Sequence, residues 1–286
     1  MSTAQIAIIG GSGLYDLQGL TNINEVDIQT PFGKPSDTIV TGELGEKKVA
    51  FLPRHGRGHR IPPTSLPVRA NIYALKTLGV EKIISVSAVG SLREEFKPLD
   101  MVVPHQLIDR TYSRTQSFFE NGPTVHISFS DPYCPSLSQL LFQTASSLHS
   151  KTHEGGSMVV MEGPAFSTKA ESHMYRTWGG DIIGMTALPE AKLAREAEIC
   201  YSTLACVTDY DCWRDSTEVV TVDMVVANLN KNVETAKRIV ETIVAKIPMG
   251  RNCDCENALK DSILTARNSV DPEALEKLGL IISKYM

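Results

Sequence analysis

Two carboxylates at the end of one apolar run are the residues of this sequence best suited to chemistry. The run ICYSTLACVTDYDCW places Asp209 and Asp211 a single residue apart, directly after residues typical of a buried β-strand. Alone, Asp-Tyr-Asp predicts a surface turn. On an extended chain, however, residues two apart point to the same side, so a ligand at the strand end would meet both carboxylates. A buried carboxyl group with a raised pKa can donate a proton, and an ionised one accepts hydrogen bonds from an amino group.

A concentration of positive charge follows another apolar run. The segment FLPRHGRGHRIPP holds Arg54, His55, Arg57, His59 and Arg60 between proline and glycine residues. It could be a solvated basic loop, or a metal site on its two histidines, but the glycines and prolines argue against the helix that such a pair needs. An anion site is favoured, because arginine offers a two-pronged fork to phosphate oxygens.

The glycine-rich turn GGSG (10–13) after the first apolar run is a second candidate for anion binding. It fails the G-x-G-x-x-G dinucleotide pattern, because Asp16 stands where the third glycine would be, and no Walker lysine follows. What remains is a turn with free backbone N–H groups and the hydroxyl of Ser12, which can hold an anion. A plain tight turn is the alternative.

Three further apolar runs end in small or hydroxyl-bearing residues. These ends are Ser87-Ala88-Val89-Gly90, Phe166-Ser167-Thr168 and Met185-Thr186. Each could be ordinary turn chemistry, but their common placement at strand ends favours one shared site, since ligands of α/β proteins bind there.

The cysteines predict no metal site. Six are scattered at 134, 200, 206, 212, 253 and 255, and only Cys253-Asp254-Cys255 forms a local pattern. Two sulfurs do not make a zinc site, which normally takes four ligands. We expect reduced thiols, with a redox-active or stabilising bridge in the C-terminal pair as the alternative.

Composition limits the partners. The chain has 286 residues, of which 42% are hydrophobic and 21% charged, and its formal net charge is -5. An acidic chain is a poor match for nucleic acid or an anionic membrane, which both favour positive surface. The start has no basic segment before an apolar core, and no later run reaches the ~18–20 apolar residues of a membrane span. We expect a cytoplasmic protein that binds neither nucleic acid nor membrane.

The elements that must position these residues alternate along the chain. Strands are predicted at 6–10, in a meander over 23–52, and at 82–92, 100–104, 157–164, 181–185 and 199–211. Helices are predicted at 65–79, 136–149, 188–199 and 221–246, in a segment through 176 that opens with the capping box Thr168–Glu171, and in two pieces beyond 256. This pattern predicts an α/β fold: a three-layer single domain with a central mixed β-sheet flanked by helices. We expect the domain to span 1–250 and a C-terminal helical tail, 251–286, to pack on it.

Several motifs, in order, give the chain a family resemblance. IAIIGGSGLYD, TPFGKPSD, RHGRGHRIPP, SAVGSLRE, MEGPAFSTKAES, IIGMTALPEA and VTDYDCW together resemble the 5′-methylthioadenosine phosphorylase family, of the trimeric purine nucleoside phosphorylase superfamily. The resemblance covers roughly residues 5–245. One departure is Leu99 in FKPLDMVVP, where relatives commonly have glycine; it is expected to alter a turn and not the chemistry.

The resemblance implies an activity and a set of roles. Such enzymes split a nucleoside with inorganic phosphate, giving adenine and 5-methylthioribose-1-phosphate, as homotrimers without metal or organic cofactor. Carried onto this sequence, phosphate would be bound by Ser12, Arg54, His55, Ser87 and Thr186. Ribose and base would contact His59, Ala88, Val89, Phe166, Ser167, Met185 and the catalytic pair Asp209 and Asp211. The methylthio pocket would be lined by Val222, Val225 and Val226, with His126 from a neighbouring subunit.

Two other functions stay open. One is phosphorolysis of 6-oxopurine nucleosides or 5′-methylthioinosine; Asp211 counts against it, because a carboxylate repels a 6-carbonyl and suits an amino group. The other is a non-catalytic nucleoside-binding protein, which the loss of Arg54, Asp209 or Thr186 would favour; all three are present.

Overall fold

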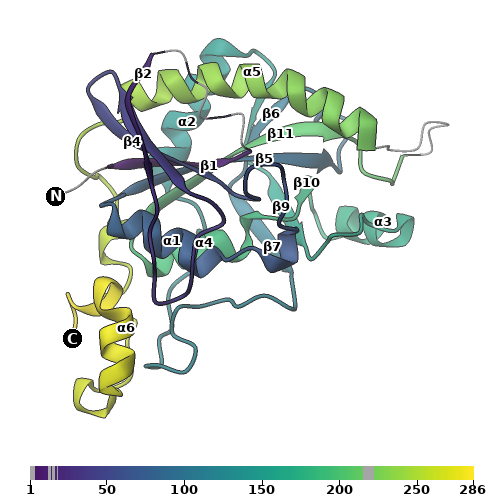
Figure 1. The fold of residues 1–286 in the computed structure, drawn as a ribbon. Helices are drawn as coiled ribbons and strands as arrows, with labels where there is room; N and C mark the ends of the chain where they lie inside the picture. Colours follow the sequence, from purple (N-terminus) through teal and green to yellow (C-terminus); the bar gives the residue numbers. More distant parts are fainter. Residues whose placement is uncertain (1–3, 12–13, 15–16, 18, 215–221) are drawn as a thin grey trace.

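The computed structural model describes residues 4–11, 14, 17, 19–214 and 222–286, without the side chains of Val222, Met224 and Val225. In these residues, eleven strands form one mixed sheet (Figure 1). The strands are β1 (Ile6–Gly10), β2 (Leu20–Val26), β3 (Ile39–Leu44), β4 (Lys47–Pro53), β5 (Lys82–Ser91), β6 (Met101–Val103), β7 (Gln106–Arg110), β8 (Thr152–Glu154), β9 (Ser157–Met161), β10 (Ile182–Gly184) and β11 (Cys200–Asp209). Antiparallel pairing of β2, β3 and β4 confirms the predicted meander.

The strand β5 lies at the centre of the sheet. Strand β11 runs parallel to it along one edge, from Cys200 opposite Lys82 to Asp209 opposite Gly90. On the other edge, β1 pairs with β5 only as far as Ser85, and antiparallel β10 begins at Gly90. Neither strand pairs with residues 86–89, so the sheet is interrupted there.

Helices cover both faces, as the alternating pattern predicts. One face packs against α1 (Val68–Thr77) and α4 (Ala187–Glu196), and the other against α2 (Pro135–Leu148) and α5 (Val222–Lys246). Figure 1 shows these two helical layers on either side of the strands. The predicted three-layer α/β architecture is confirmed.

The short helix α3 (Lys169–Thr177) begins where the sequence predicts. Thr168 Oγ1 accepts a hydrogen bond from the backbone N–H of Glu171, and the Glu171 carboxylate accepts from the backbone N–H of Thr168. These reciprocal bonds satisfy two donors that the first helical turn leaves free, so the helix start is fixed locally.

The C-terminal segment departs from the prediction of two helical pieces. Only α6 (Pro272–Ile282) is an α-helix there; 3-10 turns form at Asp254–Asn257 and Arg267–Ser269. Leu259, Leu278, Ile281 and Ile282 are buried in the larger hydrophobic core, and residues 125 and 263 form a β-bridge. The boundary at residue 250 stays a prediction.

The strands β7 and β8 were not predicted from the sequence. β7 is a polar, partly exposed segment, QLIDR, and β8 has only three residues, so neither carries an alternating apolar signal. No helix among the described residues is both long enough and apolar enough to cross a membrane.

Candidate active site

The interruption beside β5 gathers the ends of several strands. β1, β4 and β11 run parallel to β5 or to its parallel neighbour, so their carboxyl ends lie at one edge of the sheet. The backbone N–H of Arg54, after β4, donates to the carbonyl of Gly10 at the end of β1 (2.9 Å). Ligands of α/β proteins bind at such switch points, because strands part there and leave room between their loops.

Two hydroxyl groups meet at one end of this interruption. Ser87 Oγ on β5 lies 3.3 Å from Thr186 Oγ1, which follows β10 at the start of α4. Both residues are buried. Hydroxyl groups can turn their hydrogens toward an anion, so the pair is suited to binding phosphate oxygens. Ser12, the third predicted hydroxyl, lies outside the described residues.

Arg54 is engaged in a buried ion pair. Its Nε and Nη2 donate to the two carboxylate oxygens of Glu190 (2.9 and 3.0 Å), and Nη2 also donates to Ser85 Oγ (2.6 Å). Nη1 donates to the carbonyl of Val86 (3.0 Å), on the unpaired edge of β5. The two-pronged fork expected for phosphate is therefore bound to Glu190, and Arg54 joins β5 to α4.

The two histidines of the basic segment stack on each other, with ring centroids 4.2 Å apart. His55 Nδ1 lies 2.8 Å from the carbonyl of Ile61, so this nitrogen carries the hydrogen of the neutral ring. Burial, followed by the positive charge of Arg54, lowers the pKa of His55 to about 4. The ring is therefore neutral at pH 7, and Nε2 is an acceptor. His59 is exposed and has a left-handed backbone (φ 53°).

The other arginines of this segment contact carboxylates. Arg57 lies 2.5 Å from Glu25, and Arg60 lies 3.1 Å from Asp37. The positive charge apparent in the sequence is thus largely balanced by acidic residues from elsewhere in the fold.

At the other end of the interruption lies Asp209, the last residue of β11. Burial raises the pKa of its carboxyl group. Oδ1 accepts from the backbone N–H of Asp211 (2.8 Å), and Oδ2 lies 2.7 Å from Thr208 Oγ1, which in turn lies 3.2 Å from the carbonyl of Val89. The Thr208 hydroxyl has one hydrogen for two acceptors. The hydroxyl hydrogen can therefore point to the Asp209 carboxylate or to the Val89 carbonyl.

The expectation that Asp209 and Asp211 share one extended strand is wrong. β11 ends at Asp209, and Asp211 lies in a turn with a left-handed backbone (φ 52°). Aspartate tolerates this conformation in turns. The two residues nevertheless stay together: a Cβ placed on Gly90 would lie 3.0 Å from Asp209 Oδ1 and 3.4 Å from Asp211 Cβ.

Asp211 is held by a neighbouring helix. Its Oδ2 accepts a short hydrogen bond from the hydroxyl of Ser172 on α3. Burial raises the pKa of the Asp211 carboxyl group as well. Hydrogen bonds from Ser172, the backbone of Cys212 and Ser167 act in the opposite direction and favour the charged carboxylate.

The remaining predicted contacts of ribose and base are mostly small or apolar side chains. Ala88 is exposed although both its neighbours on β5 are buried, so β5 opens to solvent there. Met185 Sδ lies against Gly163, where a Cβ would come within 2.6 Å of it. Phe166 is 58% exposed, and the carbonyl of Ser167 accepts from Cys212 Sγ (3.2 Å). Both follow β9, beside the carboxylate end.

Four supporting residues were missed in the sequence: Glu190, Glu162, Arg114 and Ser172. Arg114 donates to the carbonyls of Met185 and Leu188 (2.6 and 2.7 Å) and lies 3.3 Å from the Glu162 carboxylate. It therefore fixes the loop that carries Thr186. No local pattern marks these residues, because each pairs with a segment more than 30 positions away.

The predicted methylthio residues are described only in part. Val222 and Val225 are on α5, but their side chains are not described, and Val226 is 47% exposed. His126 is exposed, and its backbone N–H donates to the carbonyl of Ser262 (2.9 Å).

Comparisons with known proteins agree with this geometry. A family model described as the phosphorylase superfamily matches residues 5–245. An S-methyl-5′-thioadenosine phosphorylase of Koribacter versatilis is 54% identical over 282 residues, which are 99% of this chain and 97% of that protein. The crystal structure of a methylthioadenosine phosphorylase from an antarctic soil metagenomic library matches with a TM-score of 0.94 at 49% identity, over 98% of this chain and 99% of the other. A mutant of the adenosine/methylthioadenosine phosphorylase of Schistosoma mansoni, solved in complex with methylthioadenosine, matches with a TM-score of 0.83 at 36% identity, over 90% of this chain and 96% of the other.

Proposed function

The chain belongs to the phosphorylase superfamily, and from that membership we propose that it catalyses the reversible phosphorolysis of 5′-methylthioadenosine. The products are adenine and 5-methylthioribose-1-phosphate, so the protein is a pentosyltransferase of purine and methionine salvage. The observation that carries the proposal is the pairing of two buried hydroxyls with one buried and one half-buried carboxyl group, at opposite ends of Ser87–Gly90.

The spacing along β5 suits a nucleoside lying above phosphate. Ser87 and Gly90 are three residues apart, or about 10 Å at ~3.3 Å per residue. Cleavage of the glycosidic bond builds positive charge on the ribose and negative charge on the departing base. A phosphate held at Ser87 and Thr186 would stabilise the first charge while attacking the sugar carbon. The neutral His55 would accept a hydrogen bond from a protonated phosphate oxygen.

The base would lie at the carboxylate end. Asp209, with its raised pKa, would donate a proton toward purine N7 and so relieve the negative charge on the leaving base. The Asp211 carboxylate would accept from the exocyclic 6-amino group. A carboxylate there matches adenine, because a 6-carbonyl offers no hydrogen to it.

Several further features are part of the proposal. Phosphate is the co-substrate and no metal or organic cofactor takes part in the reaction. The protein works as a homotrimer, in which the exposed His126 completes a neighbouring subunit's methylthio pocket. The cytoplasmic location expected from the sequence stays a prediction.

The direct test is to incubate the protein with 5′-methylthioadenosine, with and without inorganic phosphate, and to measure free adenine. We expect adenine only with phosphate. Thr186→Ala, which removes one hydroxyl at the anion end, should raise the KM for phosphate about tenfold, the loss of one charge-assisted hydrogen bond. Equal adenine release without phosphate would identify a hydrolase. Binding without any cleavage would identify a nucleoside-binding protein, and faster turnover of 5′-methylthioinosine would identify a 6-oxopurine enzyme.

A further inference from the structure

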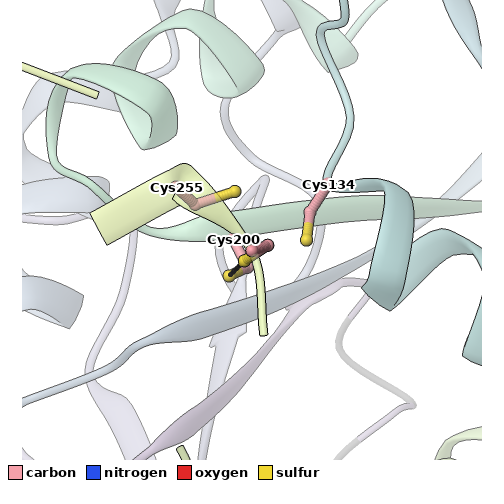
Figure 2. A group of neighbouring side chains, drawn as sticks. Cys134, Cys200 and Cys255 are labelled. Atoms are coloured by element: carbon pink, nitrogen blue, oxygen red, sulfur yellow. Dashed lines mark hydrogen bonds between the residues drawn. The ribbon is translucent and has the colours of Figure 1, made fainter. Parts of the chain in front are cut away.

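Four cysteines that are scattered in the sequence meet at the end of the molecule opposite the active site. The Sγ atoms of Cys134, Cys200, Cys253 and Cys255 all lie within 4.8 Å of one another. They come from three segments: the residue before α2, the first residue of β11, and the chain after α5. Figure 2 shows Cys134, Cys200 and Cys255 on these separate segments, with their sulfurs close together.

The four sulfurs lie close enough together to bind one ion. Cys200 Sγ and Cys253 Sγ are 3.4 Å apart, and Cys255 is within reach of both Cys134 and Cys200. A zinc ion with bonds of about 2.3 Å to four sulfurs places neighbouring sulfurs about 3.8 Å apart. The 3.4 Å separation of Cys200 and Cys253 is slightly shorter than this value, and the 4.8 Å limit for all pairs allows it.

We propose that Cys134, Cys200, Cys253 and Cys255 form a structural site for one zinc ion. An all-sulfur, four-coordinate site selects a soft cation and excludes Mg²⁺ and Ca²⁺, which take oxygen ligands. Binding exchanges four S–H bonds for four zinc–thiolate bonds and releases four protons to water, with no electron transfer. The sequence predicted no metal because Cys253 and Cys255 offer only two ligands; the fold supplies the other two.

The surroundings suit the charge of such a site. Zinc with four thiolates carries a net charge of -2, and three cations, Lys82, Lys246 and Arg251, line the cavity beside the sulfurs. This cavity has a volume of about 320 Å³ and reaches Cys134, Cys200 and Cys253, which gives the ion a route in.

The segment that carries Cys253 is already anchored to the sheet. Lys82 Nζ donates to the carbonyl of Gly250 (2.8 Å), and Arg251 Nη1 donates to the carbonyl of Glu198 (2.6 Å). A metal at the four sulfurs would tie the same segment to α2 and β11. Its role is therefore to hold the C-terminal region on the domain and not to take part in the reaction, since Cys200 and Asp209 lie nine residues apart on β11, about 30 Å at ~3.3 Å per residue.

The test is metal analysis of the whole protein, expressed with added zinc and purified under reducing conditions without a chelating column. We expect one zinc per chain by mass spectrometry of the metal. Cobalt in its place should give the intense visible bands of a tetrahedral thiolate complex. The double variant Cys253→Ser, Cys255→Ser should retain less than a tenth of the zinc, whereas Cys206→Ala, which removes a buried thiol of β11 outside the cluster, should retain all of it.

Stability and activity give independent readouts. Stripping the metal should lower Tm by about 5–10 °C and leave kcat and the KM for nucleoside and phosphate unchanged at moderate temperature. If the double variant fails to fold, the cobalt spectrum of the unaltered protein still decides. The proposal is overturned by zinc-free protein in which alkylation labels all six cysteines, by disulfides among the four, by another metal in their place, or by full zinc retention in the double variant.

Discussion

At the scale of single residues, the carboxyl groups of Asp209 and Asp211 differ in their partners and so in their expected roles. The Asp209 carboxylate accepts from the backbone N–H of Asp211 and from the Thr208 hydroxyl, whereas the Asp211 carboxylate accepts from the hydroxyl of Ser172 on α3. Burial raises the pKa of both carboxyl groups. The proposed mechanism assigns proton donation to Asp209 and selection of the base to Asp211.

Replacing Asp211 with Asn should change the preference for the base. The amide offers a donor to a 6-carbonyl and gives up a charge-assisted bond worth about 1.5–3 kcal/mol, roughly ten- to a hundredfold in kcat/KM. We expect 5′-methylthioadenosine to be weakened by that factor and 5′-methylthioinosine to improve relative to it. Asp209→Asn should instead depress turnover of both nucleosides.

The measurement is kcat/KM for both nucleosides with both variants. Ser172→Ala serves as the matched control, because it removes the hydroxyl that holds Asp211 but keeps the carboxylate; it should weaken both reactions without changing the preference. An unchanged adenine preference in Asp211→Asn would refute the assignment.

Leu99 stores backbone strain at a position where the family resemblance predicts glycine. Its φ of 77° is left-handed, and its N–H donates to the carbonyl of Val207 (2.9 Å). A non-glycine residue costs roughly 1–2 kcal/mol in this conformation. We therefore expect Leu99→Gly to be more stable than Leu99→Ala by about 1 kcal/mol.

Urea unfolding of the two variants gives this difference directly, since both lose the same side-chain contacts. Leu148, the last residue of helix α2, provides the control. There Leu148→Ala should be more stable than Leu148→Gly, the reverse of the order at Leu99. An Ala variant that equals or exceeds the Gly variant at Leu99 would show that the turn carries no strain.

At the scale of elements, the Arg54–Glu190 pair joins the unpaired edge of β5 to α4. Arg54 replaces the strand partner that β5 lacks at Val86, and Glu190 also accepts from Tyr201 (2.8 Å) on β11. This ion pair stabilises the packing of β5 against α4 at the place where one edge of β5 has no neighbouring strand.

Arg54→Met should cost about 3–5 kcal/mol of unfolding free energy, because it leaves the buried Glu190 carboxylate without its partner. The double variant Arg54→Met, Glu190→Met removes both charges and should be more stable than the single one. Urea unfolding of the single and double variants tests this. A double variant that is less stable than Arg54→Met would show that Arg54 and Glu190 are not coupled. Because Arg54→Met lowers stability, its KM for phosphate should be measured under conditions in which the variant is folded.

Local signals and long-range contacts were not equally predictable from the sequence. The capping box at Thr168 and the strand of Asp209 followed from residues a few positions apart. The partner of Arg54 did not, because Glu190 lies 136 positions away on a helix with no unusual pattern. Cys134 and Cys200 likewise give no hint that they join Cys253. Sequence periodicity sets which elements form, whereas packing decides which side chains meet.

At the scale of the whole molecule, stability should depend on pH through Glu196. Its carboxylate accepts from Ser117 Oγ and from the backbone N–H of Phe118 (both 2.7 Å), and burial raises its pKa to about 7. Between about pH 4.5 and 7 the folded protein therefore holds a proton that the unfolded chain has lost. Stability falls as pH rises through this window, by at most about 3 kcal/mol.

Glu196→Gln should flatten that part of the profile. Midpoints of urea unfolding at pH 5, 6, 7 and 8 would show it, with the exposed Glu95→Gln as control. Parallel profiles for Glu196→Gln and the unaltered protein would show that Glu196 ionises equally in both states.

The proposed trimer makes a second prediction at this scale. If His126 completes a neighbour's site, Asp209→Asn and His126→Ala impair different halves of each site. Hybrids co-expressed from both variants should contain one fully intact site and exceed the activity of either parent. Activity equal to the average of the parents, or a fully active monomer by light scattering, would exclude a shared site.

The unpaired stretch of β5 between Ser85 and Gly90 separates the proposed anion contacts from the proposed base contacts. This separation affects how the substrate range can change. The hydroxyls at Ser87 and the carboxyls beside Gly90 are about 10 Å apart and share no partner, a distance at which the effects of substitutions add independently. The base contacts can thus vary by mutation while the anion contacts remain intact. A lineage built on this scaffold can acquire a new nucleobase preference through changes at one end alone, with phosphorolysis preserved at every step.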